Sequence, residues 1–457
     1  MRGILPNKLN PFALLPNSRS VWAWGMYDFA NQSFTLIINT LLFSIFFKEV
    51  IVGGASSGTA SGAAATAGSR GDSLWSITFS ISMAIVVVLS PIVGALADAR
   101  GWRKRFLIGT GLVCVGLTCS FAVLKPGAIL LAMLLYIPAN IAYQIGENFL
   151  ASFLPGISTP RNIGKVSAIG WTMGYVGALL LLMSVAVGMK IFGLAAAQDW
   201  GPFFIFAGLW FLAGMVPTMV VLGEPPVVRG AEQGRSVVGM ALHRLGQTWH
   251  SAQHYRQLRR FFLAFFVYGM GVQVIIVFAS ILARDFGFDT TKLVLFILQL
   301  TITAGVASIV TARYQDRIGA KNTVLVFLGI WLMSTAALFV ISLVQPHPEW
   351  AFWVVGNGIG LGIGGIGTAS RSLVGRFTPV HKTAEFFGLW GMVYKSAGVV
   401  GVLLFGQVKA WVGMPASLLL LAGFFVVGVL LMVRVREREG LRAAIRAQRG
   451  VAQEPAR

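Results

Sequence analysis

Apolar runs of about 20 residues recur along the whole chain and are separated by short polar segments. Because an α-helix rises 1.5 Å per residue, a run of this length crosses the hydrocarbon core of a bilayer. The pattern predicts twelve membrane-spanning helices, at 21–47, 74–97, 106–124, 128–150, 166–192 and 201–222 and then at 259–282, 292–312, 322–344, 351–373, 385–411 and 414–434. We expect two six-helix bundles, 21–222 and 259–434, joined by a polar linker, 223–258, and flanked by tails at 1–20 and 435–457.

The first run carries polar side chains that a lipid-facing helix would avoid. At 100° per residue these side chains fall on one stripe about 80° wide. The stripe consists of Asp28, Asn31, Thr35 and Asn39. An ionisable group at this depth costs about 3 kcal/mol on insertion scales and usually faces a cavity or a partner. The stripe is therefore predicted to line a route through the membrane. A cleaved signal peptide is the alternative, but the run is too long and too polar for one.

The fourth run carries a second polar face, about 140° wide. Its members are Asn140, Tyr143, Gln144, Glu147 and Asn148. The two acids, Asp28 and Glu147, are candidates for binding a proton or a substrate. Glu147 also lies near the predicted end of its span, where an exposed acid needs no function.

The second half contains fewer polar groups within its spans. They are Gln273, Gln299, Asn357, Tyr394 and Lys395. Lys395 lies about 15 Å along its helix from the nearer end. Two interpretations stay open: a counter-charge for an acid or a substrate carboxylate, and a lysine that snorkels to the membrane edge.

Composition and charge distribution favour a membrane protein. Charged residues make up 11% of the chain, against about 25% in soluble domains, and the mean hydropathy is +0.76. The formal net charge of +20 could suggest a nucleic-acid partner. However, 28 of the 36 Lys and Arg residues fall in segments predicted to share one side of the membrane. By the positive-inside rule this bias predicts that both termini are cytoplasmic, and it argues against nucleic-acid binding.

A short charged motif occurs after the second span and again after the eighth. Asp98, Gly101 and Arg103 recur as Asp316, Gly319 and Lys321, at a constant offset of 218 residues. The first copy also contains Gly94 and Arg105, and it resembles the loop typical of the major facilitator superfamily. We interpret both copies as a latch, in which the aspartate pairs with a basic residue and a helix N-terminus and so holds one conformer. An ordinary basic turn is the alternative.

Two other patterns suggest binding sites less strongly. Gly360, Gly362 and Gly365 satisfy the dinucleotide motif literally, but they lie in an apolar span, where small residues favour close helix contact. The histidines of the linker share one helical face, which is more typical of a solvated helix than of a metal site; they are His243, His250 and His254. We therefore expect neither a metal nor an organic cofactor.

Three regions resemble one family of transporters. They are YDFANQSF (27–34), NFLASFLP (148–155) continuing to GKVSAIGWTMGY (164–175), and GGIGTASRSL (364–373) with AEFFG (384–388). Together they resemble the vacuolar effluxer (autophagy-related, amino-acid efflux) family of the major facilitator superfamily. The resemblance implies the all-α major facilitator fold, an export-type carrier and amino acids as a substrate class. Gln32 stands where the family usually has a small residue, and the Gly/Ala/Ser-rich loop 53–71 is particular to this chain.

We therefore expect a secondary active transporter that moves a small polar solute by alternating access, driven by an ion gradient, with protons as the expected ion. Arg371 and Glu385 flank the loop between the tenth and eleventh spans and are predicted to form a cytosolic gate pair. The bacterial inner membrane is the expected location and a monomer the expected state. The alternative is a non-transporting scaffold on a carrier fold. An enzyme is not favoured, because the spans contain no nucleophile–base arrangement.

Overall fold

The predicted membrane spans are present as helices. The computed structural model describes residues 17–56, 62–159, 162–224, 237–379 and 382–453. In these ranges twelve helices are long and apolar enough to cross a membrane, and no strand is formed. The prediction of an all-α fold with twelve spans is confirmed.

The first half opens with a composite span, Ser18–Ala55. It is built of α1 (Ser18–Ser33), η1 (Phe34–Leu41), α2 (Leu42–Phe46), η2 (Phe47–Val52) and η3 (Gly53–Ser56). The other five spans of this half lie on α3 (Gly62–Arg100), α4 (Arg103–Ser120), α5 (Ile129–Ser152), α7 (Ile163–Phe192) and α8 (Gly201–Val221). Three short helices connect them: η4 (Phe121–Val123), α6 (Leu154–Ile157) and η5 (Ala197–Asp199). The loop predicted at 53–71 is partly wrong, because its alanine-rich portion from Gly62 onward joins α3, as high helix propensity favours.

The second half consists of six uninterrupted helices. They are α10 (Arg256–Asp285), α11 (Thr290–Ile318), α12 (Ala320–Ser342), α13 (Glu349–Phe377), α14 (Thr383–Trp411) and α15 (Met414–Val433). Helix α10 extends three residues beyond each end of the predicted span, because polar residues can continue a helix outside the bilayer. The linker forms α9 (Val237–His254), and α16 (Glu437–Gln453) follows the last span.

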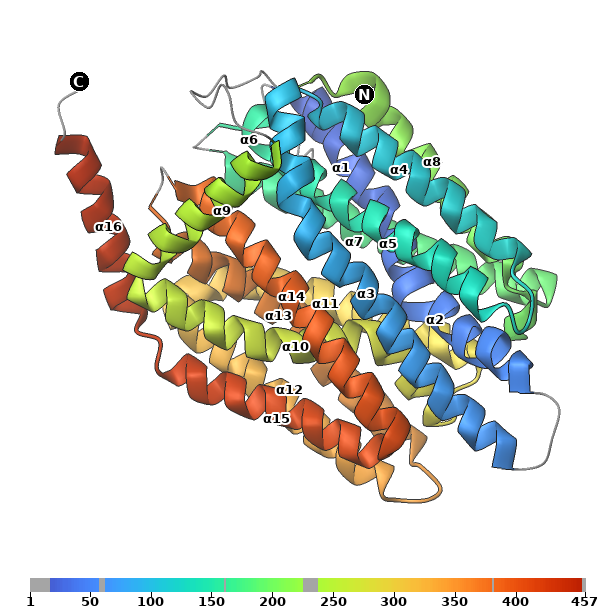
Figure 1. The fold of residues 1–457 in the computed structure, drawn as a ribbon. Coiled ribbons are helices and arrows are strands. Elements are labelled where there is room, and N and C mark those ends of the chain that lie inside the picture. The colour runs from blue at the N-terminus through green and yellow to red at the C-terminus, as the bar shows by residue number, and fades with distance from the viewer. Residues whose placement is uncertain (1–16, 57–61, 160–161, 225–236, 380–381, 454–457) are drawn as a thin grey trace, which may run out of the picture.

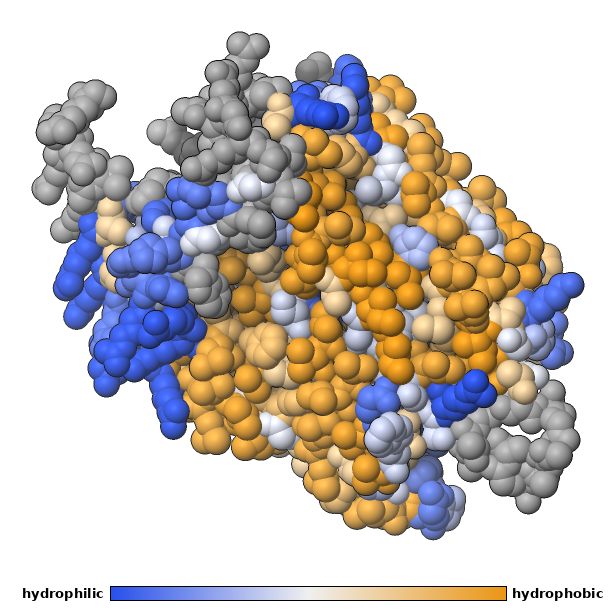
Figure 2. Space-filling model, in the orientation of Figure 1, coloured by the Kyte–Doolittle hydropathy of each residue, from blue (hydrophilic) through white to orange (hydrophobic). Residues whose placement is uncertain are grey.

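The two halves lie side by side around a shared interface (Figure 1). Helix α3 packs along α14, α7 packs along α11, and α10 contacts η1 and α2. The first span and α10 are the most enclosed of the described spans: 72% and 78% of an apolar 18-residue stretch of each is buried. On the face shown in Figure 2, apolar residues form a band across the bundle and hydrophilic residues gather at its two ends. We call the end where α1 begins and α15 ends the terminal end, and the opposite end the distal end.

Helix η1 interrupts the first span with π-helical geometry. In a π-helix each N–H bonds five residues back, so one turn takes up more residues than the 3.6 of an α-helix. The stripe predicted at 100° per residue therefore has the wrong phase beyond Ser33. On an α-helix, the side chains of residues four positions apart differ in direction around the helix axis by about 40°. The wider π-helical turn reduces this difference. Asn31, Thr35 and Asn39 consequently face the same neighbour.

Glycines allow several helix pairs to approach closely, as their spacing predicted. A Cβ added at Gly364 of α13 would lie 1.9 Å from the carbonyl oxygen of Ala304 on α11. A Cβ at Gly177 of α7 would lie 2.2 Å from the carbonyl oxygen of Phe29 on α1. The glycines thus serve as contact surfaces between helices, which is how small residues act in membrane bundles.

Replacing Gly364 by alanine should destabilise the protein, whereas Gly367→Ala should not. The added methyl group at Gly364 would collide with backbone, at a typical cost of about 1–3 kcal/mol for overpacking. Gly367 lies on the same helix with no atom within 4 Å of an added Cβ, so it is a matched control. Melting temperatures of the purified variants in detergent measure the difference. Equal melting temperatures would contradict the assigned contact between α11 and α13.

Candidate functional site

The polar faces of the first span and of α5 meet in a ladder of contacts. Asn31 Nδ2 donates to Glu147 Oε1. Thr35 Oγ1 and Tyr143 OH lie 2.7 Å apart, and Asn39 Nδ2 donates to Asn140 Oδ1 at 3.4 Å. The two predicted stripes therefore face each other, as expected for residues that would not contact lipid.

The distal part of this ladder is closed by buried hydrogen bonds. Tyr136 OH donates to Asn39 Oδ1 at 2.8 Å, and Asn140 Nδ2 donates to Ser82 Oγ of α3 at 2.7 Å. Asn39 and Asn140 are both buried, at 4% and 0% exposure. These amides have each other as partners and hold three helices together, since buried polar groups must be satisfied. Tyr136 and Ser82 were not predicted, because a single Tyr or Ser in an apolar run carries no signal of its own.

Asp28 lies at the open part of the ladder. Its side chain is half-buried and forms no hydrogen bond or ion pair with any described residue. A Cβ at Gly174 of α7 would lie 3.2 Å from Asp28 Oδ2, so glycine there lets α7 approach the carboxylate. The charged groups that act on Asp28 electrostatically are Glu147 and Arg371. Asp28 is thus a carboxylate within the bundle whose oxygens remain available to a ligand.

Lys395 reaches this region from the other half. It lies on α14 and is 9% exposed. Its Nζ donates to Asn148 Oδ1 at 2.6 Å and to the carbonyl oxygen of Gln144 at 3.2 Å, both on α5. It also acts electrostatically on Glu147. Of the two interpretations left open by the sequence, this position favours the counter-charge, because the ammonium contacts the opposite half and not the end of its own helix.

Arg371 of α13 also points toward the first half. Its Nη1 donates to Ser167 Oγ of α7 at 3.2 Å. Its guanidinium lies over the Trp171 ring at 5.0 Å and over the Trp390 ring at 5.9 Å, a geometry suited to cation–π attraction. The predicted pair with Glu385 is not formed in this conformer: among the described ion pairs none joins Arg371 to Glu385, which is exposed at the start of α14. The gate role of these two residues stays a prediction.

We name Asp28, Glu147, Arg371 and Lys395 the central charge set. Each half of the molecule contributes like charges: both acids come from the first half and both bases from the second. The set has no net formal charge, which reduces the cost of holding four ionisable groups inside a membrane protein. Within the described ranges no three His, Cys, Asp or Glu side chains gather as metal ligands.

The other predicted residues of the second half contact neighbours that do not belong to the set. Gln273 Nε2 donates to the carbonyl oxygen of Tyr394 at 3.5 Å, which joins α10 to α14 beside Lys395. Asn357 is exposed and its Oδ1 accepts from Thr303 Oγ1 at 3.3 Å. Gln299 Nε2 donates to the Trp353 carbonyl oxygen at 3.0 Å. The contacts of Asn357 and Gln299 join α11 to α13, within the second half.

The two latch motifs lie at the terminal end and share a capping device. Asp98 Oδ1 accepts from Arg103 Nε at 2.7 Å, and Glu224, just after α8, accepts from the Lys104 N–H at 3.0 Å. Carboxylates near a helix N-terminus interact favourably with its dipole and its free N–H groups.

In the second copy, Asp316 Oδ1 pairs with Arg376 at 2.6 Å. Glu437, just after α15, accepts from the Lys321 N–H at 3.0 Å and pairs with Arg376 at 2.7 Å. Gly101 and Gly319 have φ values of 64° and 91°, which favour glycine. These contacts lie within one half each, and a latch between the halves stays a prediction. The sequence signal for Glu224 and Glu437 is an acid directly after the sixth helix of each half.

Comparison with known proteins identifies the family. A model described as "Vacuole effluxer Atg22 like" matches residues 17–445. An uncharacterized MFS-type transporter, YxiO, of Bacillus subtilis is 26% identical over 424 residues, which cover 91% of this chain and 94% of that protein. Autophagy-related protein 22 of Coccidioides immitis is 24% identical over 75% of this chain and 70% of that protein.

Solved structures share the fold at low identity. The nucleoside transporter NupG matches with a TM-score of 0.64 at 12% identity, over 91% of this chain and 98% of that one. The xylose transporter XylE from E. coli, in an inward open conformation, matches with a TM-score of 0.63 at 11% identity, over 93% of this chain and 98% of that one. Both are transporters, and the likeness shows the fold alone. The chain is therefore a multi-pass membrane transporter of the major facilitator fold and belongs to the Atg22-like vacuole effluxer family.

Proposed function

We propose that this protein is a secondary active transporter that exports amino acids or similar zwitterionic solutes, coupled to protons, by alternating access. The observation that supports this most is the central charge set: the acids lie in the first half, and the bases of the second half reach across to contact α7 and α5 of the first. A zwitterion presents one charge of each sign, and both have partners of opposite sign here. The family description, vacuole effluxer, supports the export direction.

The roles of the four groups follow from their chemistry. Arg371 has a planar guanidinium suited to bidentate binding of a carboxylate, with Trp171 and Trp390 as apolar walls. Asp28 would accept the substrate ammonium group or a proton, since no described residue occupies its oxygens. Glu147 and Lys395 lie across the interface between the halves, so any change in separation alters their interaction.

Proton coupling would result from exchange at the two carboxylates. Substrate ammonium and proton would compete for the same negative charge on Asp28, which is a simple way to link opposite fluxes. We propose that the terminal end faces the cytoplasm, which the charge bias supports, and that the membrane is a bacterial inner membrane. We expect the protein to work as a monomer, because its own two halves supply every member of the set.

Counterflow in proteoliposomes tests this proposal. Vesicles loaded with an unlabelled amino-acid mixture should accumulate external labelled amino acids, and an imposed pH gradient should change the initial rate. Empty vesicles and a protonophore are the controls. Amino-acid exchange without any effect of the pH gradient would contradict proton coupling. Absence of exchange for amino acids, with exchange of another solute class, would contradict the substrate assignment alone.

A further inference from the structure

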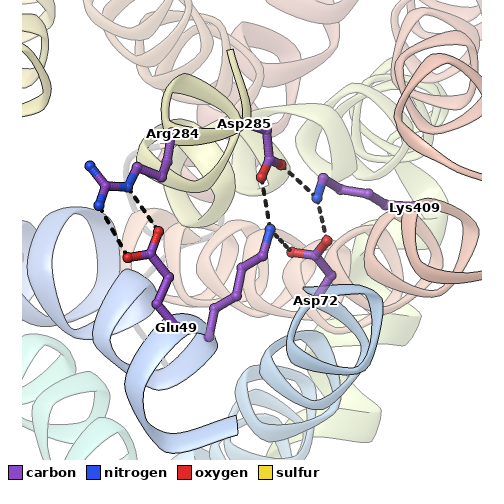
Figure 3. A network of polar contacts seen from close by, with 6 residues as sticks. Glu49, Asp72, Arg284, Asp285 and Lys409 are labelled. Atoms are coloured by element: carbon purple, nitrogen blue, oxygen red, sulfur yellow. Dashed lines mark hydrogen bonds and ion pairs between the residues drawn. The ribbon is translucent and has the colours of Figure 1, made fainter. Parts of the chain in front are cut away.

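A second group of buried charges lies between the halves at the distal end (Figure 3). Lys48 Nζ lies 3.1 Å from Asp72 Oδ1 and 2.9 Å from Asp285 Oδ1. Lys409 Nζ lies 2.7 Å from Asp285 Oδ2 and also pairs with Asp72. Each lysine thus contacts both aspartates, and the four form a closed ring of alternating charge, which we call the distal ring.

The distal ring is largely removed from solvent. Exposure of the Lys48, Asp72, Asp285 and Lys409 side chains is 13%, 4%, 24% and 5%. Charges at this degree of burial are tolerated only when they are paired, because desolvation is costly. Breaking one member leaves an unpaired charge in a place from which water is mostly excluded.

Each half supplies one lysine and one aspartate to the ring. Lys48 lies on η2 and Asp72 on α3, in the first half, whereas Asp285 ends α10 and Lys409 lies on α14, in the second. Two of the four ion pairs are therefore internal to a half, and two cross the interface. If the halves separated at this end, Lys48–Asp72 and Asp285–Lys409 could each persist. No charge would be left unpaired, so separation costs only the two crossing pairs.

Further contacts that cross the interface surround the ring. Ser73 Oγ donates to Gln407 Oε1 at 3.0 Å, and Arg284 Nε donates to Glu49 Oε1 at 2.8 Å. Deeper in, Ser280 Oγ donates to the carbonyl oxygen of Thr40. All of these hold the distal end shut in this conformer. By contrast, the exposed pair Lys292–Glu349, at 2.7 Å, lies within the second half.

We propose that the distal ring is a reversible gate, which closes the distal end of the transport route and opens by dividing into two neutral ion pairs. This inference rests on the alternating-access function proposed above. Because each half keeps one lysine and one aspartate, the ring can open without leaving an unpaired charge. This property distinguishes a gate from a permanent contact between the halves. A ring with both lysines in one half would leave two like charges together in each half when it opened, and would resist opening strongly.

Two double variants separate these alternatives, because each removes one lysine and one aspartate. Lys409→Met with Asp285→Asn deletes both crossing pairs and leaves Lys48–Asp72. Lys48→Met with Asp285→Asn leaves the crossing pair Lys409–Asp72 in place. The first double variant should populate the open distal end, and the second should stay closed. Lys292→Met serves as a control, because it removes a lysine from an ion pair that lies within the second half and does not cross the interface.

The readout is maleimide labelling of Ser280→Cys in a background with Cys114→Ala and Cys119→Ala. Ser280 is 0% exposed, and Val412→Cys, at a position 70% exposed, is the reference for access to the distal end. A membrane-impermeant maleimide is applied to intact cells and to inverted vesicles. We expect labelling at least about tenfold faster in Lys409→Met with Asp285→Asn, and within about twofold of the unaltered ring in the other double variant.

Equal labelling rates in the two double variants would overturn the proposal and indicate that the ring only stabilises the contact between the halves. Faster labelling in the variant that keeps the crossing pair would overturn it as well. Melting temperatures identify any double variant that fails to fold. If Lys409→Met with Asp285→Asn fails, Lys409→Gln with Asp285→Asn deletes the same ion pairs and takes its place, with the same expected increase in labelling. Because labelling needs no substrate, failure of amino-acid counterflow would count against the proposed function without affecting this result.

Discussion

Replacing Asp28 by asparagine should reduce transport by about 30-fold or more, because loss of one partner from a desolvated charge pair costs about 2–5 kcal/mol. Asparagine has nearly the shape of aspartate but neither its charge nor its capacity to exchange a proton. No described residue donates a hydrogen bond to Asp28, so the substitution should leave the melting temperature almost unchanged. Initial counterflow rates in proteoliposomes measure the effect.

Asp199→Asn is the matched control, since Asp199 is an exposed acid in the same half, in η5. Asp28→Glu keeps the charge but lengthens the side chain toward α7, and it should retain more activity than Asp28→Asn. Unaltered transport in Asp28→Asn would remove the carboxylate from the mechanism. If a deletion within 223–258 then abolished the cellular phenotype, the scaffold interpretation would be favoured.

The number of spans could be predicted because it depends on a local property. The bilayer fixes the length of each apolar run, and twelve such runs are visible in the sequence. Helix ends were predicted less well, because a helix can continue past the lipid where polar residues form it. Asp72 illustrates this: it lies within α3, whereas the sequence placed it just outside a span that began at residue 74.

The candidate site could be predicted in part. The two stripes correctly indicated which faces of the first span and α5 contain the polar groups, since buried polar groups in a membrane must meet one another. The π-helical turn changed the phase at Thr35 and Asn39 without separating them from α5. The spacing of apolar and polar residues in the sequence does not predict a π-helical turn.

The partners of charges could not be predicted from the sequence. Arg371 was paired with Glu385 because they lie close in sequence, yet its contacts are Ser167 and Trp171 of the other half. Lys409 lies near the end of the predicted span 385–411, and its partner Asp72 lies 337 positions away. Charged residues at the ends of apolar runs resemble those that set the orientation of a membrane protein. Only the packing of the two halves reveals which of these charges are buried together.

Replacing Lys395 by methionine should reduce transport about as strongly as the loss of Asp28, and should also lower the melting temperature. The ammonium donates to Asn148 Oδ1 at 2.6 Å across the interface, and it is the cation that acts on Glu147. Methionine fills similar volume but leaves Glu147 without that charge. Removing one of two buried opposite charges costs about 3–5 kcal/mol where they form an ion pair. No ion pair is described between Lys395 and Glu147, so the decrease in stability here should be smaller.

The double variant Glu147→Gln with Lys395→Met separates folding from transport. It removes both charges, so the melting temperature should recover, because two opposite buried charges can be replaced together by neutral groups with little loss of stability. Transport should not recover, since the interaction that changes as the halves move is gone. Lys190→Met, at an exposed position on α7, controls for loss of a lysine. Recovery of both properties would mean that the Glu147–Lys395 interaction serves stability alone, and that Asp28 and Arg371 suffice for the solute. Recovery of neither would mean that Lys395 acts through Asn148 and the Gln144 carbonyl oxygen, because the double variant restores charge balance but not those two hydrogen bonds.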